Sequence, residues 1–278
     1  VGYAANQLGG AGGPLAVFVI AIVAAEIGML VSKKTKVDII VTPFVTLLVG
    51  GGLSLLIAPA IGKGVSVIST FIGWAATQAP FVTGVIVSVV IGMVLTLPIS
   101  SAAICAGLLL TGSAAVAGSS AGLAIAGGAA VAGCCAQMVG FAVMSFREIR
   151  WGGLISQGLG TSMLQMPNIV RNPRIWIPPT VASAITGPIA TCLFKLQMNG
   201  AEINSGMGTC GLCGPLGVWT GWLSPAEKAL SKGATAIVPT AFDWVGLILI
   251  CFVLPAILTW LLGLGCRKLG WIKAGDLT

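Results

Sequence analysis

Long apolar runs, separated by short polar or charged breaks, dominate this chain. They cover residues 14–31, 39–61, 81–97, 101–118, 121–146, 175–196 and 245–266. Each is close to the roughly 20 apolar residues that an α-helix needs to cross a bilayer. The apolar residues are continuous and do not alternate with period two, which argues against a transmembrane β-barrel. The pattern predicts an all-α integral membrane protein, a polytopic helical bundle of about seven or more spans.

Two segments among these runs are too short or too polar to span. Residues 65–78 form a short, more polar stretch, and residues 197–223 are rich in glycine and weakly hydrophobic. Irregular backbone at membrane depth is tolerated only where protein buries it or where it lines a wet cavity. Broken helices of this kind form substrate sites in secondary transporters. We therefore expect re-entrant hairpins, with an interfacial segment at 65–78 and an ordinary extracellular loop at 197–223 as the alternatives.

A third polar stretch, residues 151–170, lies between two pairs of arginines. It interleaves apolar residues with Gln157, Gln165 and Asn168. This mixture is typical of a helix that lies along the membrane interface.

Charge is scarce and confined to the ends of the apolar runs. Only 8% of the 278 residues are charged, against about 25% in a soluble domain. The basic clusters at 33–36, 147–150, 171–174 and 267–273 all fall on one side if the spans are counted as above. The positive-inside rule then places these clusters and the C-terminus in the cytoplasm. The net charge of +7 reflects these topology signals, so nucleic-acid binding is not expected.

The amino-acid composition restricts further which reactions and ligands this chain could support. The 40 glycines suit closely packed or broken membrane helices. The chain has no histidine, the commonest metal ligand and general base, so a phosphohistidine relay within it is excluded.

The sequence starts at Val1 with neither methionine nor a basic n-region, so we see no signal peptide. We expect a single permease-like domain over residues 1–278, and whether earlier helices are missing stays open.

The glycine-rich segment 199–215 carries the best candidates for ligand binding. Five of its side chains could hydrogen-bond a polyol, and an intramembrane carboxylate is a functional candidate by default. These candidates are Glu202, Asn204, Asn199, Ser205 and Thr209.

Two weaker candidates lie elsewhere. Gln78 stands beside Pro80 at the end of the shorter broken segment. Glu26 interrupts the first apolar run, although a carboxylate that reaches the interface explains its position equally well.

Other motifs in the sequence give weaker evidence for a function. Cys210 and Cys213 form a CxxC pair, but the βαβ context of a redox motif is absent and zinc would need two further ligands. Most cysteines read as small buried apolar residues. Residues 112–122 lack the Gly-Lys-Ser/Thr of a phosphate-binding loop. We therefore expect no catalytic residue, no metal and no cofactor.

Two sequence motifs point to a family. Residues 42–62, TPFVTLLVGGGLSLLIAPAIG, resemble the proline-bounded span of the sugar-permease (IIC) subunits of the bacterial phosphotransferase system. Residues 204–215, NSGMGTCGLCGP, are similar to the glycine-rich signature of a IIC-like family of stand-alone membrane proteins, which includes regulators of toxin expression of the perfringolysin-regulator type. The similarity runs from about residue 37 to residue 264.

The resemblance implies a IIC-like permease fold in the bacterial inner membrane. It further implies a homodimer with a scaffold part and a mobile part, and a sugar-like ligand near re-entrant hairpins, with Glu202 and Asn204 in the matching positions. The histidine of several sugar permeases has no counterpart here. Any coupled phosphorylation would need separate phospho-carrier subunits.

Two functions follow as hypotheses. The first is a permease for a small polar, carbohydrate-like solute that works by alternating access. The second is a non-transporting sensor or regulator that keeps the same fold, because a fold does not fix a function. A membrane enzyme is disfavoured, since no acid–base constellation is visible.

Overall fold

Helices make up the regular structure of this protein. The computed structural model describes residues 13–34, 37–108, 110, 120–223 and 238–278. Three of its helical stretches are long and apolar enough to cross a membrane, and two shorter ones are apolar as well. No strand occurs within these ranges, so the predicted all-α membrane class is confirmed. The number of spans stays a prediction.

Contacts divide the chain into two compact units. The first holds residues 1–68 and 106–108, and the second holds 69–105 and 109–278. In the first unit, α2 (Gly13–Val31) packs through Ala16 and Ile20 against Ala58 of α3 (Asp38–Gln78). The single domain expected for residues 1–278 stays a prediction.

Helix α3 differs from the irregular backbone that we expected at residues 65–78. It runs unbroken through residues 65–78, where we expected irregular backbone. The hydroxyls that suggested a break are satisfied inside the helix, because Ser66 donates to the carbonyl of Lys63 at 2.8 Å and Thr77 to that of Trp74 at 2.7 Å. With 41 residues, α3 is about 60 Å long, twice the thickness of a bilayer core. The irregular backbone expected here is therefore wrong, while an interfacial location stays a prediction.

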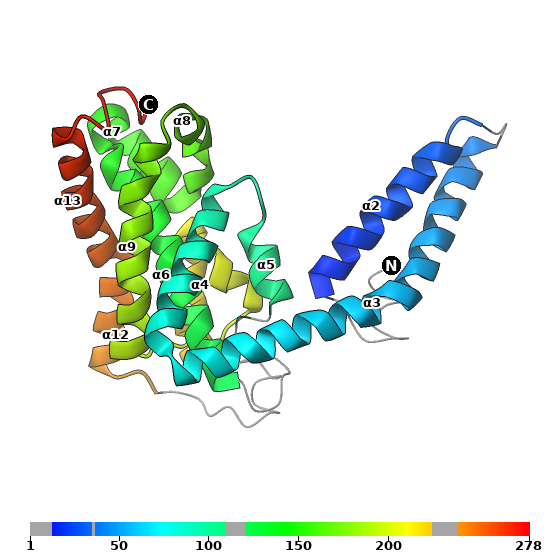
Figure 1. The fold of residues 1–278 in the computed structure, drawn as a ribbon, viewed down its shortest axis with the longest axis horizontal. Coiled ribbons are helices and arrows are strands. Elements are labelled where there is room, and N and C mark those ends of the chain that lie inside the picture. Colours follow the sequence, from blue (N-terminus) through cyan, green and yellow to red (C-terminus); the bar gives the residue numbers. More distant parts are fainter. Residues whose placement is uncertain (1–12, 35–36, 109, 111–119, 224–237) are drawn as a thin grey trace. The chain divides into compact units, whose positions relative to one another are not determined.

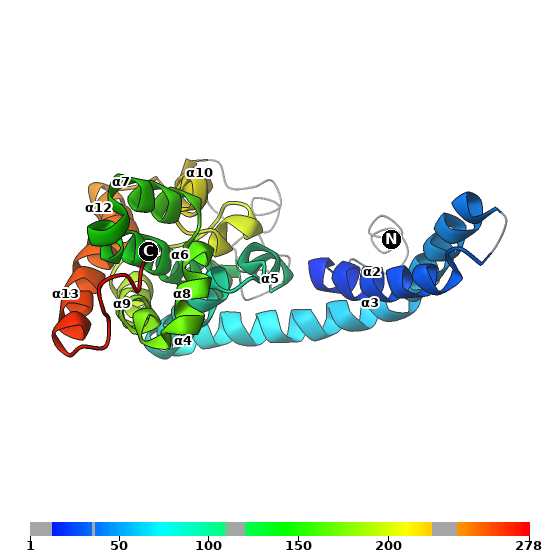
Figure 2. The same cartoon turned by 90° about the horizontal axis from the view of Figure 1, so that it is seen from above.

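The second unit is built around α6 (Ser120–Met144). Helices α4 (Pro80–Thr96), α9 (Ile177–Pro188) and α13 (Leu254–Lys268) pack against it (Figures 1 and 2). Its apolar residues from 123 to 142 are almost completely buried. Small residues on α6 let the neighbouring backbones approach closely, so this helix forms the centre of the unit.

Shorter elements complete the second unit. Short α-helices are α5 (Ser101–Gly107), α7 (Phe146–Ile155), α8 (Met166–Arg171), α10 (Cys213–Leu223) and α12 (Ala241–Ile248). Segments with π-helical bonding are η1 (Ser156–Gly160), η4 (Ile189–Leu193) and η7 (Leu249–Val253). Segments with 3₁₀ bonding are η2 (Ser162–Gln165), η3 (Pro173–Trp176), η5 (Glu202–Gly206) and η6 (Cys210–Leu212).

The predicted apolar runs match these elements well. The runs 81–97 and 121–146 correspond to α4 and α6, and the last run lies within the continuous helix Ala241–Lys268. The run 175–196 corresponds to η3, α9 and η4 and ends at Leu193. Much of the predicted run 101–118 lies outside the described residues.

The stretch 151–170 differs from the interfacial helix that we expected. It is divided among four elements, from α7 to α8. Its polar side chains point inward, since Gln157 is 2% and Gln165 1% exposed, whereas Val170 is 69% exposed. Gln165 donates to the main-chain oxygen of Leu277 at 3.2 Å. Partners distant in the sequence thus hold the polar groups inside, and the expected single amphipathic helix is wrong.

The segment 271–278 packs back onto α8 and η3. Asn172 donates from its side-chain amide to the main-chain oxygen of Trp271 at 2.9 Å and to a carboxylate oxygen of Asp276 at 2.8 Å. Leu277 is fully buried in a cluster that includes Ile169 and Ile175. Hydrogen bonds and an apolar anchor therefore fix this segment.

We expect this attachment to weaken in acid. The main-chain N–H of Lys273 and the amide of Asn172 donate to the Asp276 carboxylate and lower its pKa. A lowered pKa in the folded state gives stability that is present above the unfolded value, about 4, and is lost as the pH falls through the folded pKa. Protection of residues 271–278 in hydrogen exchange, corrected for intrinsic rates, should fall below about pH 4. In Asp276→Asn this pH response should disappear, and a response that persisted would contradict the assignment.

Candidate functional site

The chain leaves regular helix in the middle of the second unit. After α9, the π-helical turn η4 ends at Leu193, and residues 196–199 have no regular secondary structure. This irregular backbone is nevertheless buried, with Leu196 3%, Met198 0% and Asn199 6% exposed. Part of the predicted segment 197–223 therefore has the buried, non-helical backbone that we expected, and its last part is the helix α10.

Helix α6 holds the start of this segment. The main-chain N–H of Met198 donates to the carbonyl of Ala124 at 2.9 Å. A Cβ at Gly128 would overlap the carbonyl oxygen of Leu196, so only glycine allows this approach. The irregular chain thus lies directly on the helix backbone, without side chains between them.

The segment then folds back along α10. Gly200 packs on the backbone of Gly217, and Gly221 packs on the backbone of Asn199. Between these two arms the chain turns through Gly208, whose φ of 54° favours glycine. We call residues 195–223 the glycine hairpin. Whether it enters and leaves the membrane on one side stays a prediction.

Five of the predicted ligand residues lie together on the glycine hairpin. Asn199 is buried, while Glu202 and Asn204 are partly exposed. The two hydroxyl residues bond to main-chain oxygens: Ser205 donates to the carbonyl of Glu202 and Thr209 to that of Gly158, each at 2.6 Å. These hydroxyls hold the hairpin in shape, so the two amides and the carboxylate are the stronger candidates for a ligand.

The two remaining candidates are on other helices. Gln78 is exposed at the last position of α3, and Glu26 is exposed on α2 in the other unit. No hydrogen bond among the described residues joins either side chain to the hairpin. Their part in ligand binding stays a prediction.

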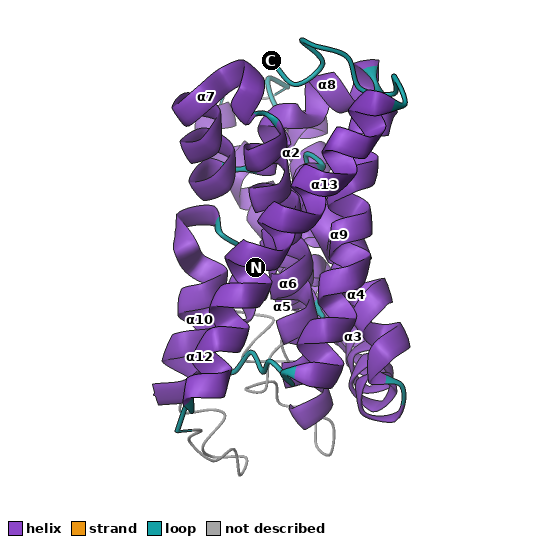
Figure 3. Ribbon diagram, turned by 90° about the vertical axis from the view of Figure 1, so that its left-hand side faces the viewer, coloured by secondary structure: helices purple, strands orange, loops and turns teal. Residues whose placement is uncertain are grey.

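A pocket of about 290 Å³ opens at the first residues of the hairpin. It is lined by Leu193, Phe194, Lys195, Leu196, Gln197, Trp222, Phe242 and Asp243. Phe194 and Phe242 stack at 4.7 Å, and Trp219 and Trp222 of α10 contact Trp244 of α12. Figure 3 shows these two helices in the same part of the second unit. Aromatic faces with a few convergent polar groups are typical of small-molecule sites. Sequence reasoning missed this pocket, because its residues come from three separate segments.

A buried polar network in the same unit was also missed. Gln137 of α6 is fully buried and accepts hydrogen bonds from the indole N–H of Trp176 at 3.0 Å and the hydroxyl of Thr96 at 3.3 Å. Its amide donates to Thr180 and Ser183 at 3.4 and 3.5 Å. A single glutamine inside an apolar run was the available signal, because an intramembrane polar residue marks a functional or structural centre.

The described residues hold no group of three or more acidic or cysteine side chains that could bind a metal ion. Cys210 and Cys213 are free and half-buried. What the hairpin offers is a carboxylate and two amides. These are hydrogen-bonding groups for a neutral polar ligand.

Comparison with known proteins gives one match. A family model described as "Phosphotransferase system, EIIC" matches residues 2–278. No curated protein matches the chain, and no solved structure does.

Proposed function

The chain belongs to the EIIC family of the phosphotransferase system, and from this membership we propose that it carries a small polar, carbohydrate-like solute across the bacterial inner membrane by alternating access. As a multi-pass membrane protein of this family, it is of the phosphotransferase-permease kind. The solute class and the mechanism are the parts that we propose.

The glycine hairpin, whose first residues have buried irregular backbone, is the observation that carries the proposal. It exposes Glu202 and Asn204 in part and keeps Asn199 beside α10. Polar groups in a membrane interior are costly unless they serve a ligand or a partner. A carboxylate accepts hydrogen bonds from the hydroxyl groups of a ligand, and an amide donates hydrogen bonds to them. Together these side chains can therefore satisfy a hydroxyl group both as a donor and as an acceptor.

Partners follow from the same family. The absence of histidine in this sequence means that a phosphoryl group would come from separate phospho-carrier subunits, if transport is coupled to phosphorylation. We also propose a homodimer, on the resemblance of residues 42–62 and 204–215 to the IIC subunits.

Uptake of labelled sugars into proteoliposomes tests the proposal. Glu202→Gln and Asn204→Ala should each weaken binding of the transported sugar by about 10- to 100-fold, the effect of losing a hydrogen bond with a charged or buried group. Asp38→Asn, an acid-to-amide change at a partly exposed residue of the other unit, should leave uptake unchanged. Unaltered binding in both hairpin variants would place the ligand elsewhere.

The alternative is a sensor or regulator that keeps the permease fold. It predicts that a solute binds and is sensitive to Glu202→Gln, yet does not enter the vesicles. Neighbouring genes separate the two hypotheses cheaply. Phospho-carrier subunits beside this gene favour the permease, and an adjacent toxin or regulator favours the sensor.

A further inference from the structure

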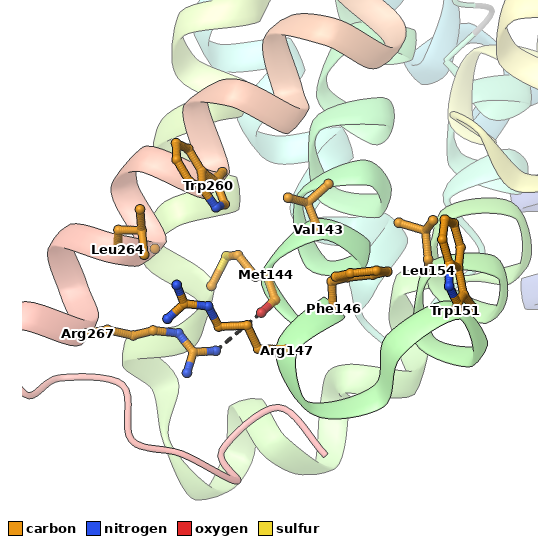
Figure 4. A pocket seen from close by; sticks show the side chains of 10 residues that line it. Val143, Met144, Phe146, Arg147, Trp151, Leu154, Trp260, Leu264 and Arg267 are labelled. Carbon is orange, nitrogen blue, oxygen red and sulfur yellow. Dashed lines mark hydrogen bonds between the residues drawn. The ribbon is translucent and has the colours of Figure 1, made fainter.

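A second cavity, of about 410 Å³, has no residue of the glycine hairpin in its lining. Its walls come from α7 and α13, and the end of α6 closes it (Figure 4). It is lined by Val143, Met144, Phe146, Arg147, Trp151, Leu154, Trp260, Gly263, Leu264 and Arg267. The lining is thus apolar and aromatic except for two arginines.

The two arginines differ in their surroundings. Arg267 is bound to Glu148, with Nη2 2.9 Å from Oε1, and also donates to the carbonyl of Met144 at 3.2 Å. This pair is mostly buried and electrically neutral. Arg147 is exposed, and no ion pair or hydrogen bond engages its guanidinium within the described part of the chain. The cavity therefore carries one uncompensated positive charge at its opening.

The close-up shows how charge and apolar surface are arranged. The guanidinium groups of Arg147 and Arg267 lie toward the same end of the cavity, and Trp260, Val143 and Leu154 extend away from them (Figure 4). Trp260 is 50% and Trp151 69% exposed. Tryptophan is enriched at the headgroup level of membranes, and the arginine cluster 147–150 belongs to the predicted cytoplasmic face. The cavity thus combines a cation at headgroup depth with an apolar wall.

A carbohydrate does not suit this lining, because its hydroxyl groups would lose water without gaining partners along the apolar wall. A free phosphate would leave the wall empty. An amphiphile with an anionic head matches both parts, since guanidinium groups bind phosphate oxygens strongly and apolar side chains bury an acyl chain.

We propose that this cavity is a binding site for an anionic phospholipid. Arg147 binds the phosphate, Arg267 borders the headgroup, and the proximal part of an acyl chain lies along Val143, Leu154 and Trp260. Basic pockets between membrane helices on the cytoplasmic side recognise anionic lipids by this chemistry. The site is separate from the solute site proposed above and does not depend on it.

Native mass spectrometry of the delipidated full chain, titrated with phosphatidylglycerol or phosphatidylcholine of the same acyl chains, tests the site. The wild type should retain the anionic lipid more strongly. Arg147→Gln should weaken phosphatidylglycerol binding about fivefold, the contribution of one cation near a membrane surface, and Arg147→Lys should keep most of it. Arg171→Gln, at an exposed arginine on α8 outside the cavity, is the matched control and should bind like the wild type.

Each other outcome overturns the proposal. Equal retention of the two lipids by the wild type would remove the charge argument. Equal losses in Arg147→Gln and Arg171→Gln would indicate general surface attraction and no built site. Displacement of the lipid by millimolar inorganic phosphate alone would assign the cavity to a soluble anion. Circular dichroism of each variant excludes misfolding as the cause of a loss.

Discussion

Gly133→Ala is expected to destroy the packing of α4 on α6. A Cβ at position 133 would overlap the carbonyl of Ser88, and the atoms that it meets are main-chain atoms that no rotamer change can move. The two helices would have to separate, which would also break the hydrogen bond from the hydroxyl of Thr96 on α4 to the side-chain oxygen of Gln137 on α6 at 3.3 Å. We expect a loss of at least about 3 kcal/mol of stability, the upper range for overpacking.

Gly265→Ala is the matched control for this substitution. Position 265 lies in α13, and a Cβ there would meet nothing within 4 Å. Alanine is favoured over glycine in a helix interior by about 1 kcal/mol, so this variant should be as stable as the wild type or slightly more stable. Thermal unfolding in detergent, followed by size-exclusion chromatography, compares the two. Similar melting of both variants would show that the α4–α6 contact tolerates a side chain.

The second large effect is expected at the ion pair between Glu148 and Arg267. Oε1 of Glu148 binds Arg267, whereas its buried Oε2 has no hydrogen-bond partner among the described residues. Arg267→Met would leave a buried carboxylate without its cation, at a cost of about 3–5 kcal/mol. The same unfolding assay would detect this loss as a lower melting temperature.

A double substitution separates the pair from its surroundings. Glu148→Leu combined with Arg267→Met should recover much of the stability, because an apolar pair replaces a charged pair at little net cost. The single and double variants together form a cycle that gives the coupling between the two side chains. Strictly additive effects would mean that the ion pair contributes nothing of its own.

Hydropathy predicted much of this fold, and the reason is visible in α4 and α6. Both helices are apolar over their whole length and are bounded by a proline or polar residues, so their limits lie within a few residues of the predicted runs. The glycine hairpin was also indicated, because its glycines and polar residues cannot face lipid. Its course along α6 and α10 was not, since it depends on contacts such as that of Gly128 with Leu196.

Where prediction failed, partners distant in the sequence decided the outcome. Gln157 and Gln165 looked like the polar face of an interfacial helix, yet they are buried because Ser145 and Leu277 supply hydrogen-bonding partners. Hydropathy records how polar a residue is and not what it will meet. Likewise, the hydroxyls of Ser205 and Thr209 could not be assigned to structural bonds until their carbonyl partners were placed.

The contacts among α4, α6 and α9 have a mechanical consequence. Gly133 of α6 lies against the backbone of Ser88 on α4, and Gly187 of α9 lies against the backbone of Gly84 and the short side chain of Ser88. Interfaces padded by long side chains can slide, because rotamers change to follow the motion. An interface of backbone and short side chains has little such compliance, and a small displacement produces a collision. In a transport cycle these three helices should therefore move as one stiff body, and any hinge must lie outside their contact.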